Sequence, residues 1–178
     1  MTKWSLVALA LLTWHDIAMA DQSVLASNEP VLQTCTSAPV KALRFFEVGE
    51  ARLARNNCQA DDLLSPPLKL TFAYDRAIPG NAMSKAAMVM LQRNLSESQF
   101  NELAPRLRAF SSAYRDIDQG DAYHIQLSAN GEVSLWLNEE RLKTEQGLEF
   151  ARAYMSIWFG PRPYSEDLKQ SLLAQSTR

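Results

Sequence analysis

The chain has 178 residues, of which 47% are hydrophobic, and its 18 basic and 20 acidic side chains give a formal net charge of −2 at pH 7. This balance excludes the strongly basic surface that phosphate-rich partners require, so we expect no nucleic-acid partner. The arginines at 106, 108 and 115 are offset by Glu102 and Asp116. The length and apolar content predict one domain with a sizeable core, and no internal repeat interrupts it.

Residues 1–20 have the pattern of a secretory signal peptide, with a basic residue, a short apolar run and small residues before the cleavage point. We predict cleavage after Ala20, export to the periplasm, and a single mature domain over residues 21–178 with no stable membrane span. The alternative, an N-terminal membrane anchor, needs about 20 apolar residues. His15 and Asp16 interrupt the run before that length.

Cys35 and Cys58 are the only cysteines of the chain. An even cysteine count in an exported protein favours a disulfide, and only one intramolecular pairing exists. A thiol nucleophile and a metal ligand are the alternatives. Neither has support in the sequence, because there is no Cys-x-x-Cys spacing and His124 is the only histidine of the mature chain.

The middle of the chain predicts a strand followed by two helices. Apolar and other residues alternate over residues 68–74, which predicts a strand, and Pro79-Gly80-Asn81 predicts a turn. Apolar residues at 83, 86, 87, 90 and 91 then share one helical stripe. Ser96 begins a capping box, which predicts the start of the second helix, and Pro105 predicts a kink or a delay near its first two turns.

The C-terminal third predicts a β-hairpin with a defined register. Apolar residues alternate over 123–127 and again over 133–137. A three-residue loop pairs Leu127 with Val133 and keeps one apolar face, whereas a two-residue loop would pair Leu127 with Ser134. Gly131 then takes the left-handed position of the loop.

After a turn at residues 138–140, the sequence predicts two further helices. The first carries Phe150, Tyr154 and Trp158 at helical spacing and ends at Gly160, the expected C-cap. The second begins at Ser165. Strands and helices therefore occur in blocks, which predicts an α+β domain whose antiparallel sheet is covered by helices on one side.

The order of these motifs from Gly120-Asp121 through the Phe-Ala-Arg-Ala and Ile-Trp-Phe-Gly stretches resembles the bacterial chalcone isomerase-like proteins. The resemblance extends over residues 40–173. It implies the open-faced β-sandwich of the chalcone isomerase type, in which a ligand cleft lies between the sheet and the helical layer.

The flavonoid-cyclising enzymes of that family use an arginine, a threonine, a tyrosine and an asparagine. By the resemblance, Phe46 stands at the threonine, Met83 at the tyrosine and Met90 at the asparagine, and no arginine lies between residues 21 and 40. Each lost donor to a developing oxyanion costs about 100- to 1,000-fold in rate. We therefore expect no catalytic residues of this type. A Ser-His-Asp site would need His124, which the strand pattern places on the solvent side, and the sequence suggests neither a metal nor a cofactor.

These replacements make the expected cleft apolar, and methionine suits a pocket that adapts to flexible chains. Non-catalytic members of the fold bind fatty acids, so the resemblance implies a fatty acid or similar apolar small molecule as ligand. Arg44 is the candidate cation for a carboxylate, with Tyr74 or Lys85 as lesser candidates. The predicted ligand-binding residues are Arg44, Phe46, Tyr74, Met83, Ala87 and Met90.

Three alternatives stay open. The apolar residues could simply fill the core, with Arg44 an ordinary exposed strand residue. An isomerase, an intramolecular lyase of the family's type acting on a different substrate, would need at least one buried tyrosine, arginine or lysine facing the cleft. A partner-binding exported protein would have a filled core and an exposed apolar patch, near Trp136 or Tyr164.

Overall fold

The structure is a computed structural model that describes residues 31–42, 46–60, 62 and 64–174. The predicted signal peptide and Arg44 lie outside the described residues. Six strands form one antiparallel sheet in chain order: β1 (Gln33–Ala42), β2 (Phe46–Arg55), β3 (Leu68–Tyr74), β4 (Ala122–Leu127), β5 (Glu132–Leu137) and β6 (Glu140–Gln146). Four helices accompany them: α1 (Gly80–Asn94), α2 (Glu97–Ser111), α3 (Leu148–Phe159) and α4 (Glu166–Leu173).

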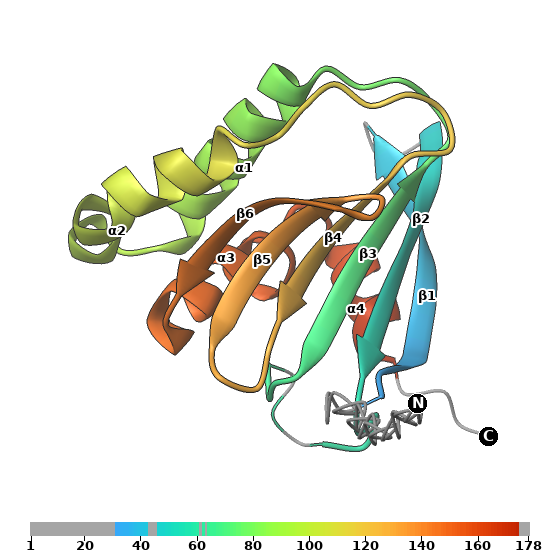
Figure 1. The fold of residues 1–178 in the computed structure, drawn as a ribbon, viewed down its shortest axis with the longest axis horizontal. Helices are drawn as coiled ribbons and strands as arrows, with labels where there is room; N and C mark the ends of the chain where they lie inside the picture. The colour runs from blue at the N-terminus through green and yellow to red at the C-terminus, as the bar shows by residue number, and fades with distance from the viewer. Residues whose placement is uncertain (1–30, 43–45, 61, 63, 175–178) are drawn as a thin grey trace, which may run out of the picture.

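The helices lie on one side of the sheet. Figure 1 shows α3 and α4 behind the strands and the α1–α2 pair beyond the upper end of β6, whereas no helix lies in front. Contacts between the layers include a hydrogen bond and an aromatic pair. The Thr36 hydroxyl donates to the Leu172 carbonyl at 2.8 Å, and the ring centroids of Phe72 and Trp158 lie 5.2 Å apart. This arrangement confirms the predicted α+β class with helices on one side of an antiparallel sheet.

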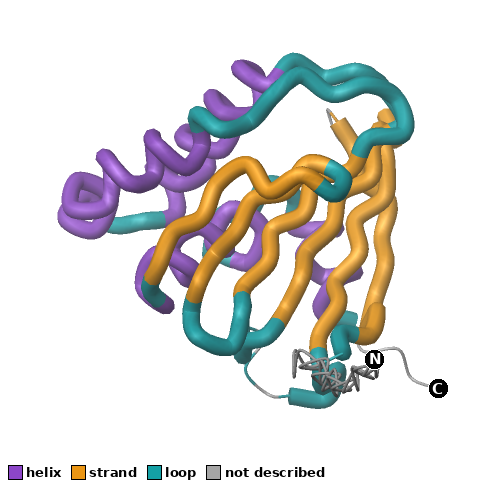
Figure 2. Tube along the Cα trace, in the orientation of Figure 1, coloured by secondary structure: helices purple, strands orange, loops and turns teal. Residues whose placement is uncertain are grey.

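The α1–α2 pair is attached to the sheet by two connections that run side by side (Figure 2). Ile78 and Ile117 form an antiparallel bridge between them, with N···O distances of 3.0 and 3.1 Å. Gly80 follows at the start of α1, where any side chain would meet the backbone of Arg115. The paired connections therefore set where α1 lies relative to the ends of β3 and β4.

The predicted hairpin register is confirmed. Leu127 lies opposite Val133 and Ile125 opposite Leu135, all four buried. Gly131 has φ +82°, the left-handed conformation that the loop requires. Because strand side chains alternate between faces, this register directs the whole apolar set toward the helices.

Helix boundaries follow local chemistry. The Ser96 hydroxyl accepts from the Gln99 backbone N–H and the Gln99 side chain accepts from the Ser96 N–H, so the predicted capping box is present. Since α2 begins directly after this cap and continues through Pro105, the proline does not delay the helix. Gly160 is the C-cap of α3, with φ −71° rather than a left-handed conformation. A glycine is needed there because the side chain of Asn94 lies where a Cβ would be.

Two of the strands that hydrophobic spacing did not predict are β1 and β6. Both lie at the edges of the sheet, and the β6 side chains are largely exposed. Edge strands bury few side chains and so leave a weak periodic signal in the sequence.

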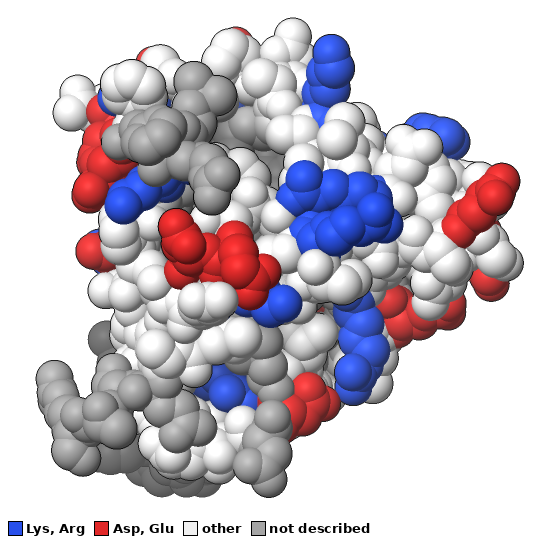
Figure 3. Space-filling model, turned by 180° about the vertical axis from the view of Figure 1, so that it is seen from behind, with Lys and Arg blue, Asp and Glu red and all other residues white. Residues whose placement is uncertain are grey.

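The helix-bearing side carries charges of both signs. Figure 3 shows basic and acidic side chains there in several clusters, some of which adjoin clusters of the opposite sign, with uncharged surface around them.

The predicted disulfide is present and connects Cys35 of β1 to Cys58 in the loop after β2. The bridge closes a loop with a sequence separation of 23 residues. We expect a Cys35→Ser, Cys58→Ser double variant to lose about 3 kcal/mol of unfolding free energy, because the unfolded chain regains the entropy of the open loop. Urea denaturation measures this change. Reducing agent should lower the wild-type midpoint and leave the double variant unaffected; equal midpoints for the oxidised wild type and the variant would contradict the prediction.

Candidate functional site

A cavity of about 370 Å³ lies between the sheet and helices α1 and α3. The ends of β1, β2 and β3 form one wall and the helices form the other. Its lining is mostly apolar: Val40, Ala42, Val48, Phe72, Tyr74, Arg76, Ile78, Ala82, Met83, Ala86, Ala87, Met90, Tyr114, Ile157, Trp158 and Tyr164. This volume lies at the lower end of the range of about 300–1,000 Å³ that small-molecule sites occupy.

Four of the six predicted ligand-binding residues line this cavity. Tyr74 ends β3, and Met83, Ala87 and Met90 lie on one stripe of α1. The helical spacing of the α1 stripe directs these side chains to a common wall. Lys85 lies on the same helix but is exposed and does not line the cavity.

Phe46 does not line the cavity, although its partner Ala42 on β1 does. Val40 pairs with Gly49 but Lys41 pairs with Glu47, so Val48 is an extra residue in β2. The bulge interrupts the regular alternation, and Val48 occupies the cavity wall. Phe46, which the family resemblance had placed at the threonine position of the cleft, is the first residue of β2 and is 60% exposed.

Sequence reasoning did not predict three residues with polar groups that line the cavity: Arg76, Tyr114 and Tyr164. Arg76 lies in a bend just beyond the end of β3, where strand alternation no longer determines the direction of a side chain. Tyr114 comes from the connection between α2 and β4 and Tyr164 from the α3–α4 loop. Only the tertiary structure brings these two tyrosines to the cavity.

The tyrosine hydroxyls of the cavity are hydrogen-bond donors. Burial raises the pKa of Tyr74, with smaller contributions from Tyr164 and Tyr123. Burial likewise raises the pKa of Tyr114 well above its ordinary value, with the neighbouring Tyr154 adding to it, and raises that of Tyr164. All three phenols are therefore protonated at neutral pH, so they can donate to a ligand oxygen but cannot act as general bases.

The hydrogen-bond partners of these hydroxyls differ. The Tyr154 hydroxyl donates to that of Tyr114 at 3.4 Å, and the Tyr164 hydroxyl donates to the Lys41 carbonyl at 3.1 Å. No described residue hydrogen-bonds the hydroxyl of Tyr74, although its side chain is only 8% exposed. Arg76 is exposed and has no ion pair or hydrogen bond within the described part of the chain. The cavity thus contains one free phenol and one free guanidinium among its described residues.

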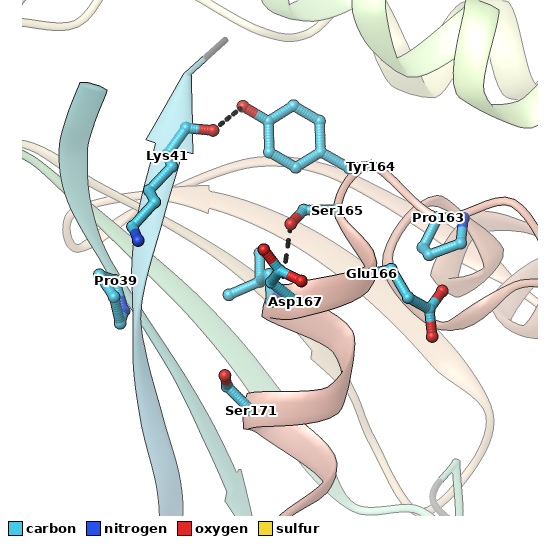
Figure 4. Close-up of a pocket in the computed structure, with 9 residues that line it drawn as sticks. Pro39, Lys41, Pro163, Tyr164, Ser165, Glu166, Asp167 and Ser171 are labelled. Atoms are coloured by element: carbon cyan, nitrogen blue, oxygen red, sulfur yellow. Dashed lines mark hydrogen bonds between the residues drawn. The ribbon is translucent and has the colours of Figure 1, made fainter. Parts of the chain in front are cut away.

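A second, polar groove lies beside the first cavity, between β1 and the start of α4 (Figure 4). It has a volume of about 450 Å³ and is lined by Pro39, Lys41, Pro163, Tyr164, Ser165, Glu166, Asp167, Leu168 and Ser171. Tyr164 lines both spaces, and Figure 4 shows its hydroxyl directed at the Lys41 carbonyl. The tyrosine therefore separates the groove from the apolar cavity.

The opposite face of the sheet carries His124 and Trp136. The His124 Nδ1 lies 2.9 Å from the Thr71 hydroxyl, and burial, followed by the charge of Lys69, lowers the histidine pKa. Trp136 is half-buried beneath the Arg141 guanidinium, which lies 5.5 Å from its ring centroid. Neither residue belongs to the cavity.

Among the described residues, no three of the His, Cys, Asp or Glu side chains are grouped so that they could hold a metal ion. In the same part of the chain, no helix combines the length and apolar character needed to cross a membrane.

The fold and the cavity define an α+β protein with an open antiparallel sheet, helices on one face and an apolar ligand-sized space between the layers. The sequence profile of the chalcone isomerase-like family matches residues 52–174, so this chain belongs to the chalcone isomerase-like family. Among solved structures, the chain is similar to a fatty-acid binding protein of Arabidopsis thaliana, with a TM-score of 0.51 and 12% identity over 82% of this chain and 85% of that one. At that identity the likeness concerns the fold alone. No curated protein matches the sequence.

Proposed function

We propose that this protein is an exported binding protein that holds a fatty acid or a similar apolar small molecule between its sheet and helices, without catalysing a reaction on it. The observation that carries the proposal is the cavity of about 370 Å³, whose lining is apolar apart from three tyrosines and Arg76. Met83 and Met90 supply flexible thioether side chains, which adapt to chains of differing shape. The fatty-acid binding protein of similar fold supports this class of ligand.

Export belongs to the same proposal. Residues 1–20 are proposed to be removed after Ala20, which leaves residues 21–178 as one periplasmic domain. The disulfide between Cys35 and Cys58 supports an oxidising compartment.

An isomerase, an intramolecular lyase of the family's type, is the second candidate function, because the cavity is not wholly apolar. Tyr74 and Tyr114 line it, and each is a protonated donor that could stabilise a developing oxyanion. The two functions differ in what is recovered. A binding protein returns its ligand unchanged, whereas an isomerase returns a product of equal mass and different chromatographic mobility.

Native mass spectrometry of the mature chain, isolated without reducing agent and then denatured to release any adduct, tests the proposal. A stoichiometric fatty acid or other small lipid is the expected result. Protein that stays free of ligand after incubation with candidate lipids would overturn the binding function.

An Ala86→Trp variant tests whether the cavity is the site. Ala86 lines the cavity from an exposed position on α1, so an indole there should obstruct the entrance without disturbing the core. We expect affinity for a fatty acid to fall by about tenfold or more, the effect of losing roughly 1.4 kcal/mol of binding free energy. Val89→Trp is the matched control, because Val89 is 50% exposed on the same helix and does not line the cavity. Equal titration curves for the two variants would exclude the cavity as the site.

A further inference from the structure

We infer that the ligand is a single-chain acid whose carboxylate lies against the Tyr74 hydroxyl and the Arg76 guanidinium, with its apolar chain between the sheet and α1. This inference rests on the proposed binding function and specifies the ligand class and its orientation. It also assigns the head group to the end of β3 instead of Arg44.

The Tyr74 hydroxyl is the first observation. The Tyr74 side chain is 8% exposed, it lines the cavity, and its hydroxyl has no partner among the described residues. Among the described residues the buried side-chain N and O atoms without a partner do not include the Tyr74 oxygen, so this hydroxyl reaches the open space of the cavity, where a ligand can accept its hydrogen bond. Burial keeps this phenol protonated, so the ligand group that it recognises is an acceptor.

Arg76 is the second observation. Arg76 is the only charged residue of the described cavity lining, and no described carboxylate pairs with it. An unopposed cation beside an apolar cavity favours an anionic head group over a neutral or cationic one. The guanidinium is exposed, so it can turn toward the ligand from the mouth of the cavity without a rearrangement of the core.

The two hydrogen-bond donors and the volume of the cavity together indicate a ligand with one carboxylate and one apolar chain. One phenol and one guanidinium match the two oxygens of a carboxylate, which arginine binds through two parallel N–H groups. The apolar wall formed by Met83, Met90 and Trp158 then faces the chain. A volume near the lower limit for ligand sites favours a single-chain acid of moderate length over a two-chain lipid.

The test compares decanoic acid with decan-1-ol, two probes that share the same chain length and differ in the head group. Isothermal titration at neutral pH of the wild type, Tyr74→Phe and Arg76→Gln should show tighter binding of the acid by the wild type. Each variant should lose about tenfold or more in affinity for the acid, the range for one charge-assisted hydrogen bond, and less than about twofold for the alcohol. Arg108→Gln, which removes an exposed cation of α2 outside the cavity lining, is the control and should bind both probes as the wild type does.

The outcomes distinguish failure of the head-group assignment from failure of the proposed binding function. Equal binding of acid and alcohol by the wild type, with no change in Arg76→Gln, would overturn the assignment of the head group while the binding function stands. Loss of acid binding in Arg44→Gln instead of Arg76→Gln would move the head group to Arg44. If neither probe binds the wild type, the binding function fails and this inference fails with it. Since Arg76 is exposed, its variant keeps the test valid even if Tyr74→Phe were to fold poorly.

Discussion

A Phe110→Ala substitution is expected to lower the free energy of unfolding by about 4 kcal/mol. Phe110 is fully buried on α2, and its ring forms T-shaped pairs with two rings of α3. The centroid distances are 5.4 Å to Phe150 and 4.7 Å to Tyr154. The substitution removes both aromatic contacts and leaves a cavity between the two helices. Because this cluster joins the α1–α2 pair to α3, no neighbouring side chain can fill the space without moving a helix.

Urea denaturation followed by circular dichroism measures this loss. Phe46→Ala is the matched control: it makes the same chemical change at a side chain that is 60% exposed, and we expect a change within about 0.5 kcal/mol. Comparable destabilisation by the two variants would mean that Phe110 is not the central contact between α2 and α3.

Gly49→Ala has the second large effect, a loss of about 3–4 kcal/mol. Gly49 has φ +155°, and a Cβ there would overlap the backbone carbonyl of Ala73 on the neighbouring strand. A backbone group cannot turn aside as a flexible side chain could, so β2 would have to move away from β3. Gly49 adjoins Val48, the extra residue of the bulge, and the shift would therefore also disturb the cavity wall.

Gly120→Ala separates this overlap from the conformational preference of glycine. Gly120 has φ +95° with no other group near the position of a Cβ, so only backbone strain of about 1 kcal/mol should appear. Thermal denaturation of both variants gives the comparison. If Gly120→Ala were as destabilising as Gly49→Ala, close packing against Ala73 would not be the cause.

Local chemistry made much of the fold predictable from sequence. The hairpin register followed from two-residue alternation and one glycine, because only a three-residue loop keeps Leu127 and Val133 on one face. The start of α2 followed from the capping box at Ser96. The disulfide followed from a single possible pairing of Cys35 with Cys58.

The candidate site was predictable where helical or strand periodicity determines the direction of a side chain. Met83, Ala87 and Met90 form one stripe of α1, and Tyr74 ends an alternating strand, so all four could be placed. Phe46 was placed by the family resemblance, but it is exposed at the first position of β2. Val48 lines the cavity beside a bulge that depends on the pairing of β2 with β1.

The sequence by itself determined the α+β class, the periodic faces of the strands and helices, the disulfide and the resemblance to the chalcone isomerase-like family, since each depends on spacing along the chain. Only the tertiary structure decided that Val48 rather than Phe46 lines the cavity, that Tyr114 and Tyr164 converge on it from separate loops, and that the Tyr74 hydroxyl is left without a described partner. These features depend on the register of neighbouring strands and on the position of α1 over the sheet. Contacts between residues far apart in the chain set both, and no local pattern in the sequence records them.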